Sequence, residues 1–362
     1  MRRIFRRITG IIALLVGMIL CVSLAVIAAF VYGNTPPPFS SEKAAEWEGV
    51  TLETDSVDHV TVRFDVRRGE SAQSVGQRLA AAGLIRSQYF WYALCRYYSK
   101  DPVKSGTYLI EIPANQIAIH RILVSGRQIL MRVTVAEGLT LKKTAALLEE
   151  AGVCPAKEFL AAACDPAMIE RYRIPGSSME GYLYPDTYLF PSAYPAAQVV
   201  QAMADNFFTR IGEIDEKTLS MPPDELNRLV ILASIVEREY RLDEEAPVMA
   251  GVFFNRLNIG MALQSCATVE YVITEIQGRP HPEILLTRDT EIRDPYNTYV
   301  RPGLPPGPIC APGPVALGAV LAPAKSAYLY FRLIDPAVGK HYFSSTLDDH
   351  IRAGKLYVKG RS

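Results

Sequence analysis

The feature that most constrains this chain is a run of 25 residues without a charged side chain, from Ile8 to Tyr32. A helix rises about 1.5 Å per residue, so the run is longer than the roughly 30 Å hydrocarbon core of a bilayer. It predicts a transmembrane helix over residues 8–32. Arginines precede the run, and the charges that follow it are mixed: Glu42, Lys43, Glu46 and Glu48. The positive-inside rule therefore predicts a cytoplasmic tail at 1–7 and an extracytoplasmic remainder.

A cleaved signal peptide is the alternative, because Ala25-Val-Ile-Ala-Ala29 offers small residues for cleavage. The apolar run exceeds the roughly 7–15 residues typical of signal peptides, which favours a retained anchor in the cell membrane. Residues 33–57 begin with a proline-rich stretch, Thr35-Pro-Pro-Pro38, and continue with charged residues. This composition predicts a stiff linker that holds the folded domains away from the membrane.

Charge and cysteine usage exclude several classes of function. The chain has 38 Lys+Arg and 38 Asp+Glu, so no net positive field attracts nucleic acid. Five of the six cysteines lie outside the apolar run, and neither a Cys-x-x-Cys pair nor a His-Glu-x-x-His run occurs. The sequence therefore predicts no metal, no cofactor and no disulfide-dense scaffold, and it leaves a single Cys154–Cys164 bridge open.

A strand–turn–helix pattern occurs twice, 69 residues apart. Residues 60–66 alternate like a strand, a turn follows, and a capped helix is expected over 72–82. The order recurs from residue 131, and the paired positions match without a gap: Gly69 with Gly138, Ser71 with Thr140, Leu79 with Leu148 and Gly83 with Gly152. This predicts an α+β architecture, with a small repeat-built domain at 58–172 that serves binding or packing, and a larger mixed α+β domain at 173–362.

A helix is expected over 224–240, because Pro222-Pro223 and the acids after them are typical of a helix start. At about 100° per residue, Glu237 falls on one narrow face with Leu226, Val230 and Ala233. A carboxyl group on an apolar face stays protonated to a higher pH, which is how a general acid arises at neutral pH. The alternative is that Glu237 leans into solvent and pairs with Arg238 or Arg241.

Several blocks of sequence carry a family signature: Glu180-Gly-x-Leu-x-Pro-Asp-Thr-Tyr188, Ala233-Ser-Ile-Val-Glu-Arg-Glu239, Phe254-Asn-Arg-Leu257, Leu263-Gln-Ser265 with Thr268-Val269, Tyr296-Asn-Thr-Tyr299, Gly303-Leu-Pro-Pro-Gly307 and Tyr328-Leu-Tyr-Phe331. In these blocks, and in their order, the chain resembles the endolytic murein transglycosylases of the MltG (YceG-like) family. The resemblance implies an enzyme that cleaves peptidoglycan between N-acetylmuramic acid and N-acetylglucosamine without water and leaves 1,6-anhydro ends. It also implies that the repeats form a LysM-like, peptidoglycan-binding region.

The resemblance places Glu237 on the family's catalytic glutamate, and a single carboxyl group is sufficient for the family reaction. Polar and aromatic side chains of the shared blocks are expected to bind the sugars: Asn255, Arg256, Gln264, Thr268, Tyr296, Asn297 and Thr298, with Glu180 and Asp186 as outer supports. The expected partners are peptidoglycan strands, the membrane, and cell-wall synthases or division proteins. Cys266-Ala267 departs from the Asp-Pro of many members, and Ile309-Cys310-Ala311-Pro312 is a second departure.

Two rival functions stay open at this point. A hydrolytic muramidase would use Glu237 as the acid and a second carboxylate to activate water, for which Glu239, Asp186 and Asp294 are the candidates. A non-catalytic wall-binding scaffold would recruit synthesis or division proteins through the repeats.

Overall fold

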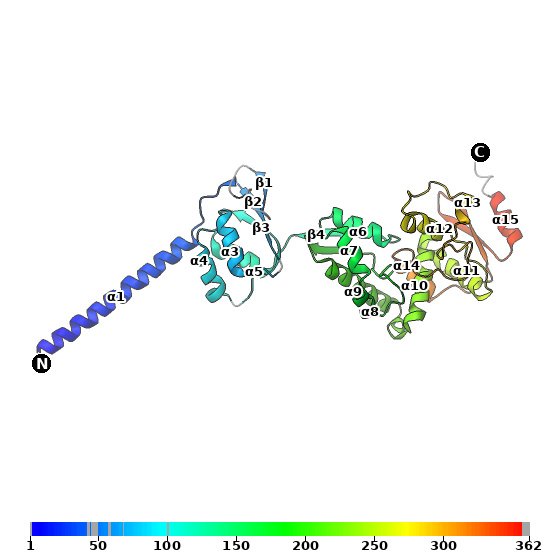
Figure 1. Ribbon diagram of the computed structural model, residues 1–362. Coiled ribbons are helices and arrows are strands. Elements are labelled where there is room, and N and C mark those ends of the chain that lie inside the picture. Colours follow the sequence, from blue (N-terminus) through cyan, green and yellow to red (C-terminus); the bar gives the residue numbers. More distant parts are fainter. Residues whose placement is uncertain are drawn as a thin grey trace. The chain divides into compact units, whose positions relative to one another are not determined.

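The computed structural model describes residues 2–41, 44, 50–56, 59–67, 69–99 and 101–356 (Figure 1). It divides into two compact units. The first unit comprises Met1–Leu130 and Pro191–Ala193, and the second comprises Met131–Phe190 and Tyr194–Ser362.

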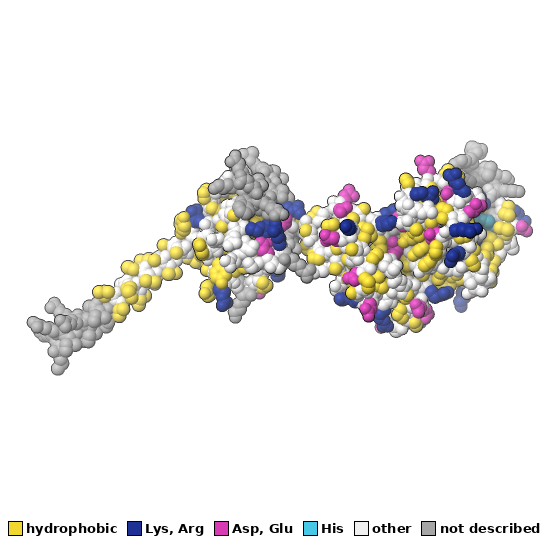
Figure 2. Space-filling model, in the orientation of Figure 1, with side chains coloured by type: hydrophobic (Ala, Val, Ile, Leu, Met, Phe, Trp, Pro, Cys, Tyr) yellow, Lys and Arg dark blue, Asp and Glu magenta, His cyan; other side chains and the backbone are white. Residues whose placement is uncertain are grey.

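The N-terminal helix α1 (Arg2–Asn34) matches the predicted transmembrane segment. Its Leu14–Asn34 portion is long and apolar enough to cross a membrane. The described side chains along it are mostly exposed and apolar (Figure 2). The last turn of α1 contacts the first unit, since Phe30 packs edge-on against Phe90 and the Asn34 Oδ1 accepts the Ile117 N–H at 3.0 Å. The Asn34 side chain thus satisfies a first-turn N–H of a helix, which has no partner within that helix.

The first unit is built on a three-stranded antiparallel sheet in the order β1 (Val50–Ser56), β2 (His59–Val66), β3 (Gly106–Ile112). Alternate residues of β2 are buried, as its period of two predicts. They pack with the indole of Trp91 and the apolar side chains of the helices. These helices are α3 (Ala72–Ala81), α4 (Gln88–Ala93) with the π-helical turn η1 (Leu94–Tyr98), and α5 (Gln116–Ser125).

The two predicted strand–turn–helix copies are both present. Ser71 caps α3 by accepting the Ser74 N–H, and Thr140 caps α6 (Leu141–Glu150) by accepting the Lys143 N–H. The paired turn glycines have nearly equal positive φ angles, 76° at Gly69 and 73° at Gly138, a conformation that favours glycine.

The sequence analysis expected one domain at 58–172, but the two copies fall in different compact units. The second copy belongs to the second unit, where β4 (Leu130–Thr134) pairs with β5 (Thr187–Pro191). Leu141 and Leu148 of α6 are buried in the same core as Tyr182 and Phe207. Similar local signals therefore produce similar local structure, whereas the apolar partners available to each copy determine where it packs.

The second unit is mainly helical around one long core, and a small antiparallel sheet lies near its C-terminal end. Its longest helices are α9 (Ala196–Ile214), α10 (Pro223–Glu239) and α11 (Ala246–Asn258). The shorter helices are α7 (Ala156–Ala163), α8 (Pro166–Arg171), α12 (Cys266–Tyr271), α13 (Thr287–Thr290), α14 (Pro314–Leu321) and α15 (Leu347–Leu356). The sheet pairs β6 (Tyr330–Asp335) with β7 (Lys340–Ser344), and helical turns lie at η2 (Glu216–Ser220), η3 (Asp243–Glu245) and η4 (Val272–Ile276).

The predicted helix over 224–240 is α10, which begins at Pro223 with Asp224 and Glu225 in its first turn. The sequence analysis expected one narrow buried face, but all seven residues from Val230 to Val236 are buried. The reason is that α14 and α11 both pack against α10. The mixed α+β architecture with an apolar N-terminal helix is confirmed.

We expect a chain that begins at residue 29 to be more stable than one that begins at residue 41. The segment between these starts contributes Phe30, which packs on Phe90, Phe39, which packs on the core of the first unit, and Asn34, which bonds α5. Losing two apolar contacts and one helix-end hydrogen bond costs about 2–4 kcal/mol. Urea denaturation of both chains measures the difference. Equal midpoints for the first unit would show that the segment is only a tether.

Candidate active site

The last turn of α10 carries two carboxyl groups, Glu237 and Glu239. Residues two positions apart on a helix are rotated by about 200° about the helix axis. The side chains of Glu237 and Glu239 therefore point to nearly opposite sides of α10. Their surroundings therefore have to be described separately.

Glu237 faces two loops of the second unit. Its Oε2 accepts the N–H of Gly313, the residue before α14, at 2.9 Å. Burial raises the pKa of Glu237 to about 7, the Gly313 N–H opposes this rise and the Glu137 carboxylate adds to it. The predicted elevation of this pKa is therefore present. The alternative, an ion pair of Glu237 with Arg238 or Arg241, is absent from the described contacts.

Glu137 lies beside Glu237 because the turn after β4 reaches α10. A Cβ added to Gly313 would come within 2.4 Å of the Glu137 Oε1, so Glu137 occupies the space next to the residue that bonds Glu237. The turn is held by two backbone bonds of 2.8 Å, from Gly138 N–H to the Ala311 carbonyl and from Ala311 N–H to the Leu139 carbonyl. The second repeat copy thus contributes directly to the surroundings of Glu237.

Glu239 points toward the loop before α12. Its Oε1 accepts a hydrogen bond from the Ser265 hydroxyl. Burial raises the pKa of Glu239, the Ser265 bond opposes this, and the Glu270 carboxylate raises it further. Glu239 therefore also holds its proton to a higher pH than an ordinary glutamate does.

A cavity of about 280 Å³ opens beside Glu239. It lies between the end of α10, the start of α12 and the β6–β7 sheet. Its lining is Arg238, Glu239, Arg241, Cys266, Ala267, Glu270, Phe331, Arg332, Leu333 and His341, and does not include Glu237. Within it, Arg238 and Glu270 form an ion pair of 3.1 Å. Of these two residues, Glu239 is the one in the lining of this cavity.

The predicted residues Thr268 and Thr298 support Glu239 indirectly. Their hydroxyls are 2.9 Å apart, both side chains are buried, and the Thr298 hydroxyl accepts the Ser265 N–H at 3.0 Å. Gln264 is exposed next to this pair, with a positive φ of 50° and its N–H bonded to the Thr298 carbonyl. These residues fix the loop that presents Ser265 to Glu239.

Three other predicted residues donate to backbone carbonyls. The Asn255 amide bonds Ser326 and Tyr328, the Arg256 guanidinium bonds Leu329 and Leu263, and the Asn297 amide bonds Thr290 and Ile292. Tyr296 packs on Tyr271, with ring centroids 5.0 Å apart. The donors of Asn255, Arg256 and Asn297 thus hold loops together in the described structure, and their contact with sugars stays a prediction.

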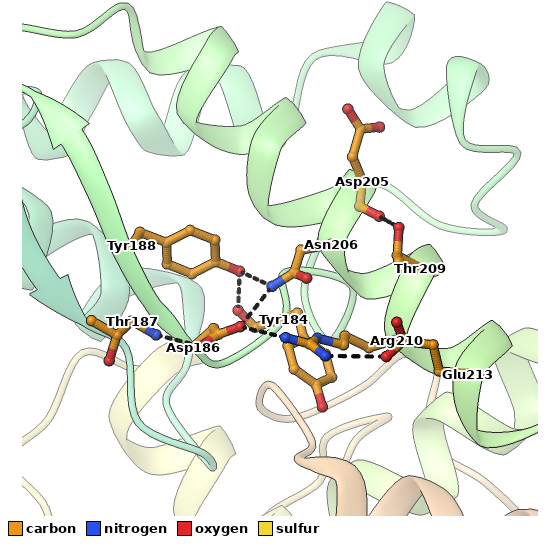
Figure 3. A network of polar contacts seen from close by, with 9 residues as sticks. All are labelled: Tyr184, Asp186, Thr187, Tyr188, Asp205, Asn206, Thr209, Arg210 and Glu213. Carbon is orange, nitrogen blue, oxygen red and sulfur yellow. Dashed lines mark hydrogen bonds and ion pairs between the residues drawn. The ribbon is translucent and has the colours of Figure 1, made fainter.

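The two predicted outer supports have contrasting surroundings. Glu180 is buried, accepts the Leu141 N–H at 3.1 Å, and has its pKa raised to about 8 by burial. Asp186 points at Asn206 and Arg210 of α9 (Figure 3), at 3.1 and 3.5 Å. Burial acts to raise the pKa of Asp186, but the Thr187 N–H and these two side chains outweigh it and lower the pKa.

The sequence analysis missed Glu137 and Ser265 as neighbours of the two glutamates. One signal was available for Glu137, because the first repeat copy has Arg68 at the matching position. Ser265 lies in the shared block Leu263-Gln-Ser265, but its bond to Glu239 depends on the packing of distant segments. Among the residues that the structure describes, no group of three His, Cys, Asp or Glu side chains could hold a metal ion.

A second cavity, of about 530 Å³, lies where α8, α9 and the start of α10 meet. Its lining includes Tyr172, Asp205, Phe208 and Leu219 but none of the predicted site residues. Size alone therefore does not identify the site, and the carboxyl group in the smaller cavity carries the chemical argument.

Comparison with known proteins agrees with the resemblance found in the sequence. The model of the YceG-like family matches residues 64–355. The chain is 29% identical over 344 residues to an endolytic murein transglycosylase of Streptococcus pneumoniae serotype 2, covering 86% of this chain and 60% of that protein. It is 28% identical over 327 residues to an endolytic murein transglycosylase of Bacillus subtilis, covering 86% and 88%. A crystal structure of a yceG-like protein from Listeria monocytogenes matches with a TM-score of 0.55 and 28% identity, covering 81% of this chain and 98% of that one.

We expect Glu237→Gln to stabilise the protein by an amount that depends on pH. The pKa of Glu237 is about 7 when folded against an ordinary 4.5, so ionisation favours the unfolded chain as the pH rises from 4.5 to 7. Glutamine does not ionise, so the variant does not lose stability in this pH range. The stability difference between variant and wild type should be small below pH 4.5, grow up to about pH 7 and then stay level, reaching about 1–3 kcal/mol. Urea denaturation at several pH values measures it, and a pH-independent difference would contradict the raised pKa.

Proposed function

The chain belongs to the YceG-like family, and on that premise we propose that it is a membrane-anchored lytic transglycosylase that cleaves peptidoglycan glycan strands at internal bonds. The relatives that cover most of this chain are named endolytic murein transglycosylases. The observation that carries the proposal is the partly enclosed cavity in front of Glu239, a carboxyl group whose pKa is raised by burial. A protonated acid facing open space is the group that glycosidic cleavage requires.

The anchor determines where cleavage takes place. α1 has the length and composition of a single membrane span, and the arginines before it favour a cytoplasmic N-terminus. Both folded units then lie outside the membrane, where new glycan strands are made, so cleavage would limit strand length there. The first unit would hold the glycan as a LysM-like module, and cell-wall synthases or division proteins would work beside it.

The proton donor has two candidates at the end of α10. The resemblance assigns it to Glu237, whose pKa of about 7 suits the role. The cavity favours Glu239, because its lining includes Glu239 and not Glu237. The Glu237 Oε2 instead accepts the Gly313 N–H. We therefore favour Glu239 as the acid and keep Glu237 as the alternative, with Glu137 and Gly313 as its partners.

The reaction needs only one such group. The protonated carboxyl gives its proton to the glycosidic oxygen between N-acetylmuramic acid and N-acetylglucosamine while the muramic C1 becomes oxocarbenium-like. The resulting carboxylate then takes the proton of the muramic C6 hydroxyl, whose oxygen bonds to C1. The products are a free N-acetylglucosamine 4-hydroxyl and a 1,6-anhydromuramic end. Ser265, held by Thr268 and Thr298, would orient the carboxyl group throughout.

Hydrolysis is the rival reaction, and it needs a second carboxylate to activate water. Asp186 is bound to Asn206 and Arg210, and Asp294 accepts the Tyr296 N–H, so both have other roles. Glu270 lines the cavity and is paired with Arg238. It is the carboxylate that hydrolysis would have to use.

We expect Glu239→Gln to reduce kcat by about 10²- to 10⁴-fold, as loss of a general acid does, while Glu237→Gln stays within about tenfold of wild type. Glu244→Gln, which removes an exposed carboxylate from the turn after α10, is the matched control. Release of soluble fragments from uncrosslinked glycan strands measures the rates, and melting curves check folding. If Glu237→Gln is inactive and Glu239→Gln is active, the general acid is Glu237 and not Glu239.

The new chain ends distinguish the two reactions. The C6 hydroxyl is tethered to the reacting ring, and tethering favours it over water by several kcal/mol. Digestion in heavy-oxygen water should give 1,6-anhydro ends without label, in fragments of several disaccharides. Mass spectrometry of the ends measures this. Reducing ends that carry heavy oxygen would mean hydrolysis and would direct attention to Glu270.

A further inference from the structure

The lining of the cavity beside Glu239 also contains a histidine, His341 of β7. Its side chain is only 6% exposed, and the centroids of the Phe331 and Phe343 rings lie 6.0 and 6.4 Å from that of the imidazole. A polar group in such apolar surroundings is expected to have hydrogen-bond partners. The partners of its two ring nitrogens therefore indicate what the ring can do.

Glu245 of η3 holds one side of the imidazole. Its Oε2 lies 2.7 Å from the Nδ1 of His341, and its two oxygens also accept the backbone N–H of His341, at 3.0 and 3.2 Å. An ionised carboxyl group can only accept hydrogen bonds, so it fixes the neutral ring in the tautomer that carries its proton on Nδ1. The other nitrogen, Nε2, is then a hydrogen-bond acceptor and a base.

The Nε2 of His341 is the nitrogen without a partner. No hydrogen bond joins it to any residue that the structure describes, and it keeps contact with solvent. The Nε2 of His120 also lacks a partner, but it is fully enclosed. Because His341 lines the cavity, we infer that its Nε2 is presented there, in the same lining as the Glu239 carboxyl group.

The pair of Glu245 and His341 has the arrangement of a general base. In such a pair the carboxylate orients the imidazole and stabilises the imidazolium that forms when the opposite nitrogen takes a proton. The backbone bonds of Glu245 join η3 to β7 whatever side chain residue 341 carries. They do not account for an imidazole with a partnerless nitrogen at the cavity.

The charges around His341 link its protonation to that of Glu239. Burial is the main cause that raises the pKa of Glu239, and a positive charge on His341 opposes it. Once Glu239 has given up its proton, its negative charge favours proton uptake by the imidazole. The ionisable groups that surround the ring in this way are Glu245 of η3, Glu239 and Arg238 of α10, Arg241 of the following turn, and Cys266 and Glu270 of α12.

We propose that His341, oriented by Glu245, is the base that takes the proton of the muramic C6 hydroxyl while Glu239 acts as the acid. This inference rests on the proposed function and divides its two proton transfers between two groups. Glu239 protonates the glycosidic oxygen, whose bond to C1 breaks, and the C6 hydroxyl gives its proton to the His341 Nε2 as its oxygen bonds to C1. The imidazolium then returns a proton to the Glu239 carboxylate through solvent, which restores both groups.

His341→Gln should lower kcat by about 10²- to 10⁴-fold, as loss of a general base does, with little change in KM. Glu245→Gln should cause a smaller loss, because glutamine orients the ring but does not stabilise the imidazolium as a carboxylate does. His350→Gln is the matched control, since His350 packs on Tyr330 and is not in the cavity lining. Initial rates on uncrosslinked glycan strands measure the effects, and melting curves check folding.

The pH profile separates a base from a residue that only supports the fold. In the wild type, kcat/KM should fall at low pH, where His341 is protonated, and at high pH, where Glu239 is ionised. His341→Gln should lose the fall at low pH, and added imidazole should restore activity to His341→Ala. A wild-type kcat in folded His341→Gln would overturn the proposal, and so would a low-pH fall that persists in it.

A binding measurement distinguishes failure of this proposal from failure of the proposed function. A tetrasaccharide of the glycan strand with sulfur in place of the central glycosidic oxygen resists cleavage, and its binding should shift the NMR resonance of the His341 Nε2. If the wild type cleaves no glycan but this resonance shifts, His341 faces a glycan site and the transglycosylase assignment is wrong. If the wild type cleaves glycan and the resonance does not shift, the enzyme is correct and the base is wrong. If neither occurs, both are wrong.

Discussion

The burial of α10 is the constraint on which the rest of the second unit depends. Seven successive residues, Val230 to Val236, are buried because α14 and α11 both pack on the helix. A helix enclosed in this way cannot rotate about its axis without breaking many apolar contacts. The carboxyl groups that follow immediately, Glu237 and Glu239, are therefore held in fixed directions. The directions of these carboxyl groups are therefore set by the apolar packing of the preceding turns of α10.

A second constraint is the pairing of two loops around Glu237. The turn after β4 and the proline-rich loop before α14 exchange backbone hydrogen bonds through Gly138, Leu139 and Ala311. Gly138 has a positive φ of 73°, which bends the turn so that Glu137 reaches Gly313. The turn after β4, whose sequence repeats that of the first unit, thus becomes part of the surroundings of Glu237. The second copy is thus part of the unit that contains α10.

The parts of the fold that could be predicted from the sequence are those determined by neighbouring residues. The apolar helix α1, the caps at Ser71 and Thr140, and the start of α10 all follow from local rules of composition and capping. The placement of the two copies in different units could not be predicted in this way, because it depends on contacts between apolar side chains that are far apart in the sequence. The same holds for the site. The donors of three predicted site residues, Asn255, Arg256 and Asn297, bond backbone carbonyls in the described structure. A polar residue in a shared block can hold a loop as readily as a ligand.

The two carboxyl groups of α10 show why similarity of motif and identity of role are separate questions. The block Ala233-Ser-Ile-Val-Glu-Arg-Glu239 contains two glutamates, and the resemblance places the catalytic acid at Glu237. Because helical geometry sends them to opposite sides, one meets the loop pair and the other meets the cavity. Burial raises the pKa of both, so electrostatics alone does not separate them. Access does, since an acid must reach the glycosidic oxygen to protonate it. By this criterion we favour Glu239, which lines the cavity, over Glu237 as the proposed acid.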